Sequence, residues 1–135
     1  MPTKRQQGSG YELEVQKYLE GQGYKIHRAY ASLFKIGNKT LCRSNDIFSV
    51  VDIIAKKKDH FTKWIQVSTG TRRAEKEKKL KGIGDIWTAS DSVELWLRFD
   101  NKVWKIYRYQ QTEQGKEFVE VAKIERGKYF EITDK

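Results

Sequence analysis

The feature that most constrains the fold is the run of residues 47–55, which is almost wholly apolar and rich in β-branched side chains. Such a run predicts a strand buried on both faces of a sheet, and it is interrupted by one carboxylate, Asp52. Residues 56–60 are short and polar, so they predict a turn into a second strand over residues 61–69. We therefore expect an antiparallel hairpin within a central sheet.

The rest of the chain predicts a mixed α/β fold, a single domain whose central mixed β-sheet is flanked by helices. Residues 1–7 are interpreted as a flexible basic N-terminal tail and residues 8–135 as one continuous domain. Ser9 is the expected N-cap of a first helix, with Glu12 three residues later as in a capping box. Residues 31–45 predict a loop or insertion with little regular structure. Further strands are expected at residues 24–30, 93–99, 102–109 and 118–124, a short extension at 129–132, and a second helix at 72–81.

Charge is the second informative feature, because the chain has a net charge of +9 that is concentrated in one stretch. Residues 56–81 hold ten basic residues against three acidic ones, which is +7 of the total. A clustered basic field suits a polyanion such as nucleic acid, whereas a solvated lysine-rich surface is the plainer alternative. No run approaches the roughly 18 apolar residues of a membrane span. With a single cysteine and no secretory signal, we expect a cytoplasmic, intracellular protein.

Asp52 is a candidate site residue because a carboxylate inside an apolar strand is costly unless it is paired or metal-bound. The alternative is an aspartate at a strand bend, satisfied by backbone amides. In the expected hairpin, Gln66 and Ser68 lie two residues apart on one face and can meet Asp52. Converging oxygen atoms suit Mg²⁺ or Mn²⁺, and Glu12 is a further candidate carboxylate whose plainer role is helix capping. Asp46, six residues before Asp52, is expected to serve a cap or turn.

These residues resemble the PD-(D/E)XK nuclease superfamily, and most nearly its archaeal-type and phage Holliday-junction resolvases. The resemblance covers residues 8–81 and rests on Gly-Ser-Gly-Tyr-Glu at 8–12, Leu-Glu-Gly-Gln-Gly-Tyr at 19–24 and Val-Asp-Ile-Ile-Ala at 51–55. It implies an α-β-β-β-α-β restriction-endonuclease-like core, metal-dependent hydrolysis of DNA phosphodiesters, and a two-fold homodimer acting on four-way junctions.

Carried over by position, the resemblance gives Glu12 as the helix acid and Asp52 as the main metal ligand. Gln66 stands where a second acid is usual, and its carbonyl is a weaker, uncharged ligand. Ser68 stands where a catalytic lysine is usual and supplies no cation, so Lys56 or Lys63 is a candidate replacement. The Gln-Val-Ser sequence is similar to variants among phage-like members.

The sequence therefore predicts a Mg²⁺-dependent endodeoxyribonuclease, with Glu12, Asp52, Gln66 and Ser68 as its catalytic set. A catalytically degenerate nucleic-acid-binding protein on the same fold is the alternative, and a basic structural or partner-binding domain is a third. The residues expected to contact DNA phosphates are Arg43, Lys56, Lys57, Arg72, Arg73 and Lys76.

Overall fold

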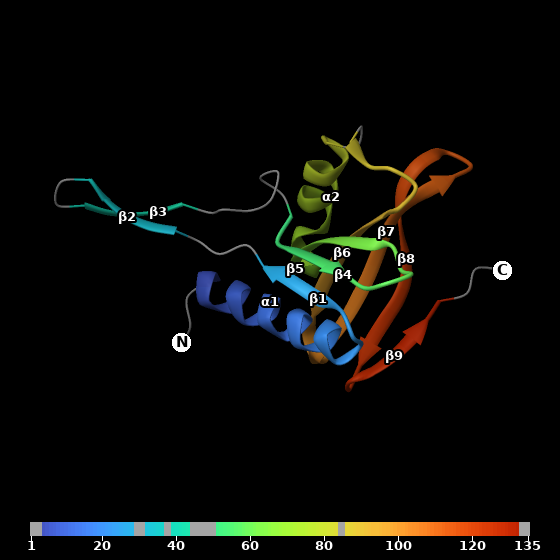
Figure 1. Cartoon of the computed structure of the whole chain (residues 1–135), viewed down its shortest axis with the longest axis horizontal. Helices are drawn as coiled ribbons and strands as arrows, with labels where there is room; N and C mark the ends of the chain where they lie inside the picture. Colours follow the sequence, from blue (N-terminus) through green and yellow to red (C-terminus); the bar gives the residue numbers. More distant parts are fainter. Residues whose placement is uncertain (1–3, 29–31, 37–38, 44–50, 84–85, 133–135) are drawn as a thin grey trace.

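The protein is a three-layer α/β domain, seen here as a computed structural model that describes residues 4–28, 32–36, 39–43, 51–83 and 86–132. Helix α1 (Lys4–Gly21) covers one face of a seven-stranded sheet, and the shorter helix α2 (Arg73–Lys81) covers the other (Figure 1). Within the described ranges, no helix is both long enough and apolar enough to cross a membrane. The mixed α/β class expected from the sequence is confirmed.

The sheet has the strand order β1-β4-β5-β6-β7-β8-β9. All neighbouring strands are antiparallel except β5 and β6, which are parallel and are joined by the crossover through α2. The hairpin of β4 and β5 is present as predicted, and the last four strands form a meander. The strands span Lys25–Arg28 (β1), Ile53–Lys56 (β4), Thr62–Thr69 (β5), Asp91–Phe99 (β6), Val103–Thr112 (β7), Gly115–Glu125 (β8) and Lys128–Glu131 (β9).

Two separate hydrophobic clusters hold the helices on the sheet and define its two faces. On what we call the α1 face, Val15 and Leu19 of α1 pack with Ile65 and other sheet residues. On the α2 face, Leu80 of α2 packs with a second set that includes Leu95. Because successive side chains of a strand point to opposite faces, β5 turns Lys63, Ile65 and Val67 to the α1 face and Trp64, Gln66 and Ser68 to the α2 face.

Three expectations from the sequence were wrong at the N-terminal side of the chain. Helix α1 begins at Lys4, so residues 4–7 are helical instead of a tail, and Ser9 lies inside the helix instead of capping it. Lysine, arginine and glutamine are good helix formers, which extends the helix upstream of Gly8. Within 31–45, β2 (Ser32–Ile36) and β3 (Lys39–Arg43) pair as an antiparallel hairpin, which extends away from the main sheet in Figure 1.

Of the apolar strand expected over residues 47–55, the structure describes residues 51–55. Strand β4 begins at Ile53, and residues 47–50 lie outside the described part of the chain. Val51 packs in the α2-face cluster and Ile53 in the α1-face cluster, so the chain does not alternate regularly between them. Asp52 therefore lies at a bend where the chain enters the sheet.

Candidate functional site

Asp52 is held against β5 by hydrogen bonds at the start of β4. Asp52 is only 4% exposed, and its Oδ2 atom accepts a hydrogen bond from the backbone N–H of Val67 at 2.8 Å. The same oxygen accepts a second bond from Nε2 of Gln66 at 2.9 Å, while the Asp52 backbone N–H donates to the carbonyl of Ile65 at 2.9 Å. Both expectations for Asp52 thus hold in part: it is buried beside Gln66, and it is also satisfied at a bend by a backbone amide.

Gln66 and Ser68 lie on the same face as Asp52, as the spacing of two predicted. Both are buried, at 3% and 9% exposed. The amide of Gln66 turns its nitrogen, not its oxygen, toward the carboxylate. A carboxylate favours this orientation, because an N–H attracts its negative charge and a carbonyl repels it.

Lys76 of α2 brings a cation to this face of the sheet. Its side chain is half-buried and interacts electrostatically with Asp52. Burial, with the neighbouring charges of Arg72 and Lys79, holds the pKa of Lys76 below its ordinary value, while Asp52 and Glu75 act in the opposite direction. The sequence placed Lys76 among the DNA contacts; in the structure it also lies within electrostatic range of the candidate metal ligand Asp52.

The two arginines at the start of α2 are both engaged on the helix itself. Arg72 bonds to Glu75 through Nη2 at 2.9 Å, and both side chains are about half exposed. Arg73 bonds to Glu77 at 2.5 Å and also lies over the ring of Tyr107, with its Cζ atom 4.2 Å from the ring centroid. Both arginine side chains remain exposed, at 52% for Arg72 and 45% for Arg73, and Arg73 in addition packs against the Tyr107 ring.

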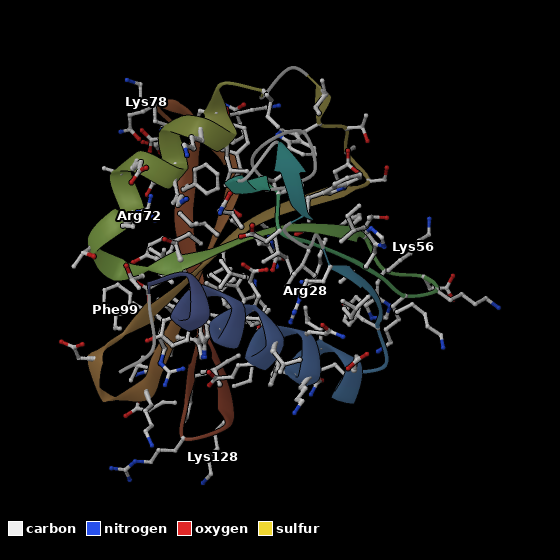
Figure 2. All side chains as sticks on the ribbon, turned by 90° about the vertical axis from the view of Figure 1, so that its left-hand side faces the viewer. Arg28, Lys56, Arg72, Lys78, Phe99 and Lys128 are labelled. Carbon is white, nitrogen blue, oxygen red and sulfur yellow. The ribbon has the colours of Figure 1, made fainter. Side chains whose placement is uncertain are left out.

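The basic stretch of residues 56–81 divides into two regions in space. Lys56 is the last residue of β4 and Lys57 follows it, so both lie at the end opposite Asp52, about 13 Å along the strand for the four residues from Asp52 to Lys56. Figure 2 shows Lys56 and Arg72 at opposite sides of the molecule. Lys63 faces the α1 face and pairs with Glu94 at 2.6 Å. Neither Lys56 nor Lys63 therefore lies beside Asp52.

The remaining predicted residues are less closely tied to Asp52. Glu12 is half-buried on α1, whose core side chains pack on the face of the sheet opposite Gln66. Arg43 is the last residue of β3, and Asp46 lies outside the described residues. The structure thus joins Asp52 to Gln66 by a hydrogen bond, places Ser68 on the same face of β5 as Gln66, and brings Lys76 within electrostatic range of Asp52.

Sequence reasoning missed two charged groups, the half-buried Arg28 and the fully buried Glu94. Arg28 of β1 pairs in register with Ile53, one residue from Asp52, and lies between α1 and the sheet (Figure 2). Glu94 of β6 is fully buried on the α1 face. The criterion that identified Asp52 was an acidic residue within an apolar run. Glu94 meets the same criterion, since it is the one acid within the apolar run of residues 93–97.

The oxygen donors of this site fit only a cation that keeps much of its own water. A carboxylate has about four lone-pair positions, so two N–H bonds at Oδ2 of Asp52 are compatible with metal coordination. Gln66 adds its carbonyl only after its amide turns over. Among the described residues, no three His, Cys, Asp or Glu side chains gather as a metal-binding group. Mg²⁺, which is held in proteins by one or two carboxylates, is compatible with so sparse a set.

Comparison with known proteins adds no relative: no family model matches this chain, and neither the curated proteins nor the solved structures give a match.

Proposed function

We propose that this protein is a metal-dependent endonuclease that hydrolyses DNA backbone phosphodiesters, with four-way junctions as its preferred substrate. The observation that carries the proposal is the buried Asp52 carboxylate, held by β5 and accompanied by the half-buried cation Lys76. The order α1, β1, β4, β5, α2, β6 also supports it, because this is the α-β-β-β-α-β order that the resemblance implies, with the β2–β3 hairpin inserted.

The chain supplies three roles at this site. Asp52 is the anionic ligand, and its bonds to β5 fix its carboxylate before any ligand arrives. Gln66 is the additional oxygen donor once its amide turns over, whereas Glu12 lies on the helix that covers the other face of the sheet. When bound there, Mg²⁺ or Mn²⁺ would polarise water and stabilise charge on the scissile phosphate. Lys76 would supply the cation that Ser68 lacks, since its ammonium interacts electrostatically with the same carboxylate.

The remaining contacts to DNA would come from cations around this site. Arg72, Lys78 and Lys79 are exposed on or next to α2, on the same side of the sheet as Asp52. Contacts of this type bind phosphates without reading bases, which suits an enzyme that recognises DNA shape. Junction selectivity and the homodimer follow from the proposed substrate, whose two strands are cut symmetrically.

A second candidate function is nucleic-acid binding without catalysis. Two observations favour it: Asp52 is already satisfied by two N–H donors, and Gln66 presents nitrogen to it instead of oxygen. In that case the cations of α2 hold DNA and Asp52 fixes the β4–β5 hairpin.

One assay separates these functions. The purified protein is incubated with a four-way junction or a matched linear duplex in Mg²⁺, Mn²⁺ or EDTA, and both cleavage and binding are measured. We expect junction cleavage that requires the metal, and its loss in Asp52→Asn with binding retained, because the variant keeps an oxygen for the Val67 N–H.

Asp59→Asn is the matched control, since Asp59 is exposed in the β4–β5 turn with φ 63°, a conformation that asparagine also accepts. Binding of the junction without cleavage in any metal would establish the second candidate instead. Full cleavage by Asp52→Asn would remove Asp52 from catalysis.

A further inference from the structure

A pocket of about 300 Å³ lies on the α1 face, on the opposite side of the sheet from Asp52. It is enclosed by the C-terminal end of α1, the β4–β5 turn and strands β5, β6, β7 and β9. Its volume is at the lower end of the range for small-molecule sites. The residues that carry the inference below are Tyr24, His60, Lys63, Glu94, Arg108 and Tyr129.

Glu94 forms the floor of the pocket, and its charge is already satisfied by the protein. Its Oε2 atom accepts bonds from Lys63 at 2.6 Å and Ser92 at 2.7 Å, and its Oε1 atom accepts one from the indole of Trp96 at 2.9 Å. Nη2 of Arg108 is 3.5 Å from Oε2, a longer approach. Arg108 is therefore not needed to satisfy Glu94, and its side chain is 39% exposed.

The pocket walls carry a surplus of positive charge. Lys57, Lys63 and Arg108 face one carboxylate, Glu94, which leaves a net charge of about +2 before His60 is counted. Because Nδ1 of His60 lies 2.9 Å from the carbonyl of Lys58, which only accepts, Nδ1 carries the proton of this ring. A basic pocket over a neutralised floor favours an anionic ligand.

Aromatic rings form the rest of the wall. Tyr24 and His60 meet edge to face, with ring centroids 6.1 Å apart. The Nζ atoms of Lys57 and Lys63 lie 5.5 and 5.8 Å from the centroid of the Tyr24 ring. Tyr129 lies at the rim and is 48% exposed. Flat aromatic surfaces beside cations match a ligand that has both an aromatic ring and a phosphate.

We propose that this pocket binds a nucleoside monophosphate unit, with its phosphate at Arg108 and its base against Tyr24 and Tyr129. The unit is either a free nucleotide or the 5′-terminal nucleotide of a strand, since both present the same chemistry. The inference goes beyond the endonuclease proposal and does not depend on it, because the pocket shares no side chain with the Asp52 site.

The test is calorimetric titration of the full chain in EDTA with AMP, CMP, inorganic phosphate and adenosine. We expect saturable binding of the monophosphates, and binding at least about tenfold weaker for inorganic phosphate or adenosine alone, since each retains only part of the recognised chemistry. A 5′-phosphorylated trinucleotide and its 5′-hydroxyl form distinguish the sources. Tighter binding of the phosphorylated strand identifies a strand end, and tighter binding of AMP or CMP identifies a free nucleotide.

Variants localise the binding. Arg108→Gln should weaken monophosphate binding about tenfold or more, because a charge-assisted bond to phosphate is lost. Arg126→Gln, the same change at an exposed position outside the pocket, should bind as the unchanged protein does. Asp52→Asn should also bind normally, so failure of the endonuclease proposal leaves this test intact. Absence of saturable binding, or equal affinity in Arg108→Gln with an unchanged melting temperature, would overturn the inference.

Discussion

Replacing Glu94 by glutamine tests whether the buried ionic cluster on the α1 face stabilises the fold. The change keeps the shape of the side chain and removes its charge from beside Lys63 and Arg108. Removing one partner of a buried ion pair costs about 3–5 kcal/mol. Because the side chains of Lys63 and Arg108 are 18% and 39% exposed and retain access to water, we expect the lower figure, about 3 kcal/mol. For a domain of this size that lowers the melting temperature by roughly 10 °C.

The pH dependence of stability provides a second test of the Glu94 cluster. Burial opposes ionisation of Glu94, but the charge of Lys63 and the hydrogen bonds from Lys63, Ser92 and Trp96 outweigh it and hold the pKa of Glu94 below its ordinary value. The stabilisation is therefore fully present above the pKa of an unfolded glutamate, about 4.3, and is lost as the pH falls through the lower folded pKa. The stability difference between the protein and Glu94→Gln should shrink over that window.

The measurements are denaturant unfolding at pH 7 and a series of melts from pH 7 to pH 2. Glu113→Gln is the control, because Glu113 is exposed in the β7–β8 turn. A cost for Glu94→Gln below about 1 kcal/mol, or no larger than that of the control, would refute the cluster as a source of stability.

Three further predictions concern the α2 face. Lys76→Gln should reduce junction cleavage by about 100-fold or more, with Lys81→Gln as the exposed control on the same helix. If Lys76 acts as a cation, the cleavage rate should also fall as the pH rises through the lowered pKa of Lys76, which lies below the usual lysine value of about 10.4. A cleavage rate that does not change with pH up to that value would contradict this role. Ser68→Lys should destabilise the fold by at least about 2 kcal/mol and leave the rate no higher, because Ser68 is 9% exposed; a faster enzyme with an unchanged melting temperature would show that the site lacks a cation. Arg72→Ala should reduce the slope of log K against log salt for duplex DNA by about 0.9, whereas Arg73→Ala should lower the melting temperature through loss of its contact with Tyr107; equal slopes for Arg72→Ala and the unchanged protein would exclude a phosphate contact.

The sequence predicted the β4–β5 hairpin and its polar face well, because strand alternation fixes which side chains share a face. Asp52, Gln66 and Ser68 were grouped on that basis, and the structure places them together. Assigning Lys76 to the same face of the sheet required one more step, which uses the spacing of residues along α2. Leu80 is the one buried residue of α2, so it marks the side of the helix that faces the sheet. Lys76 precedes it by four residues and shares that side.

Other features were missed, some because they depend on tertiary contacts and one although the sequence carries a local signal for it. The first helix extends through Gly8 and Gly10, which the sequence suggested as its start. The β2–β3 hairpin does leave a local signal, since Gly37-Asn38 separates two runs containing Leu33 and Leu41. The cluster around Glu94 draws Lys63 from β5 and Arg108 from β7, so only the sheet order reveals it.

The α1-face pocket has a consequence for the dynamics of the chain. It is built from both ends of the described chain, with Tyr18 contributed by α1 and Tyr129 by β9. Strand β9 is short, lies at the edge of the sheet and is exposed along its length. Segments of this kind open locally at low free energy, well before the whole domain unfolds.

A ligand that contacts Tyr129 is lost when β9 opens, so its binding free energy is added to the cost of opening that strand. The amide hydrogens of β9, and that of the next residue Ile132, which donates to the carbonyl of Val121 at 2.8 Å, should then exchange more slowly as the ligand concentration rises. Local opening of the last strand and ligand binding in the pocket are therefore coupled equilibria.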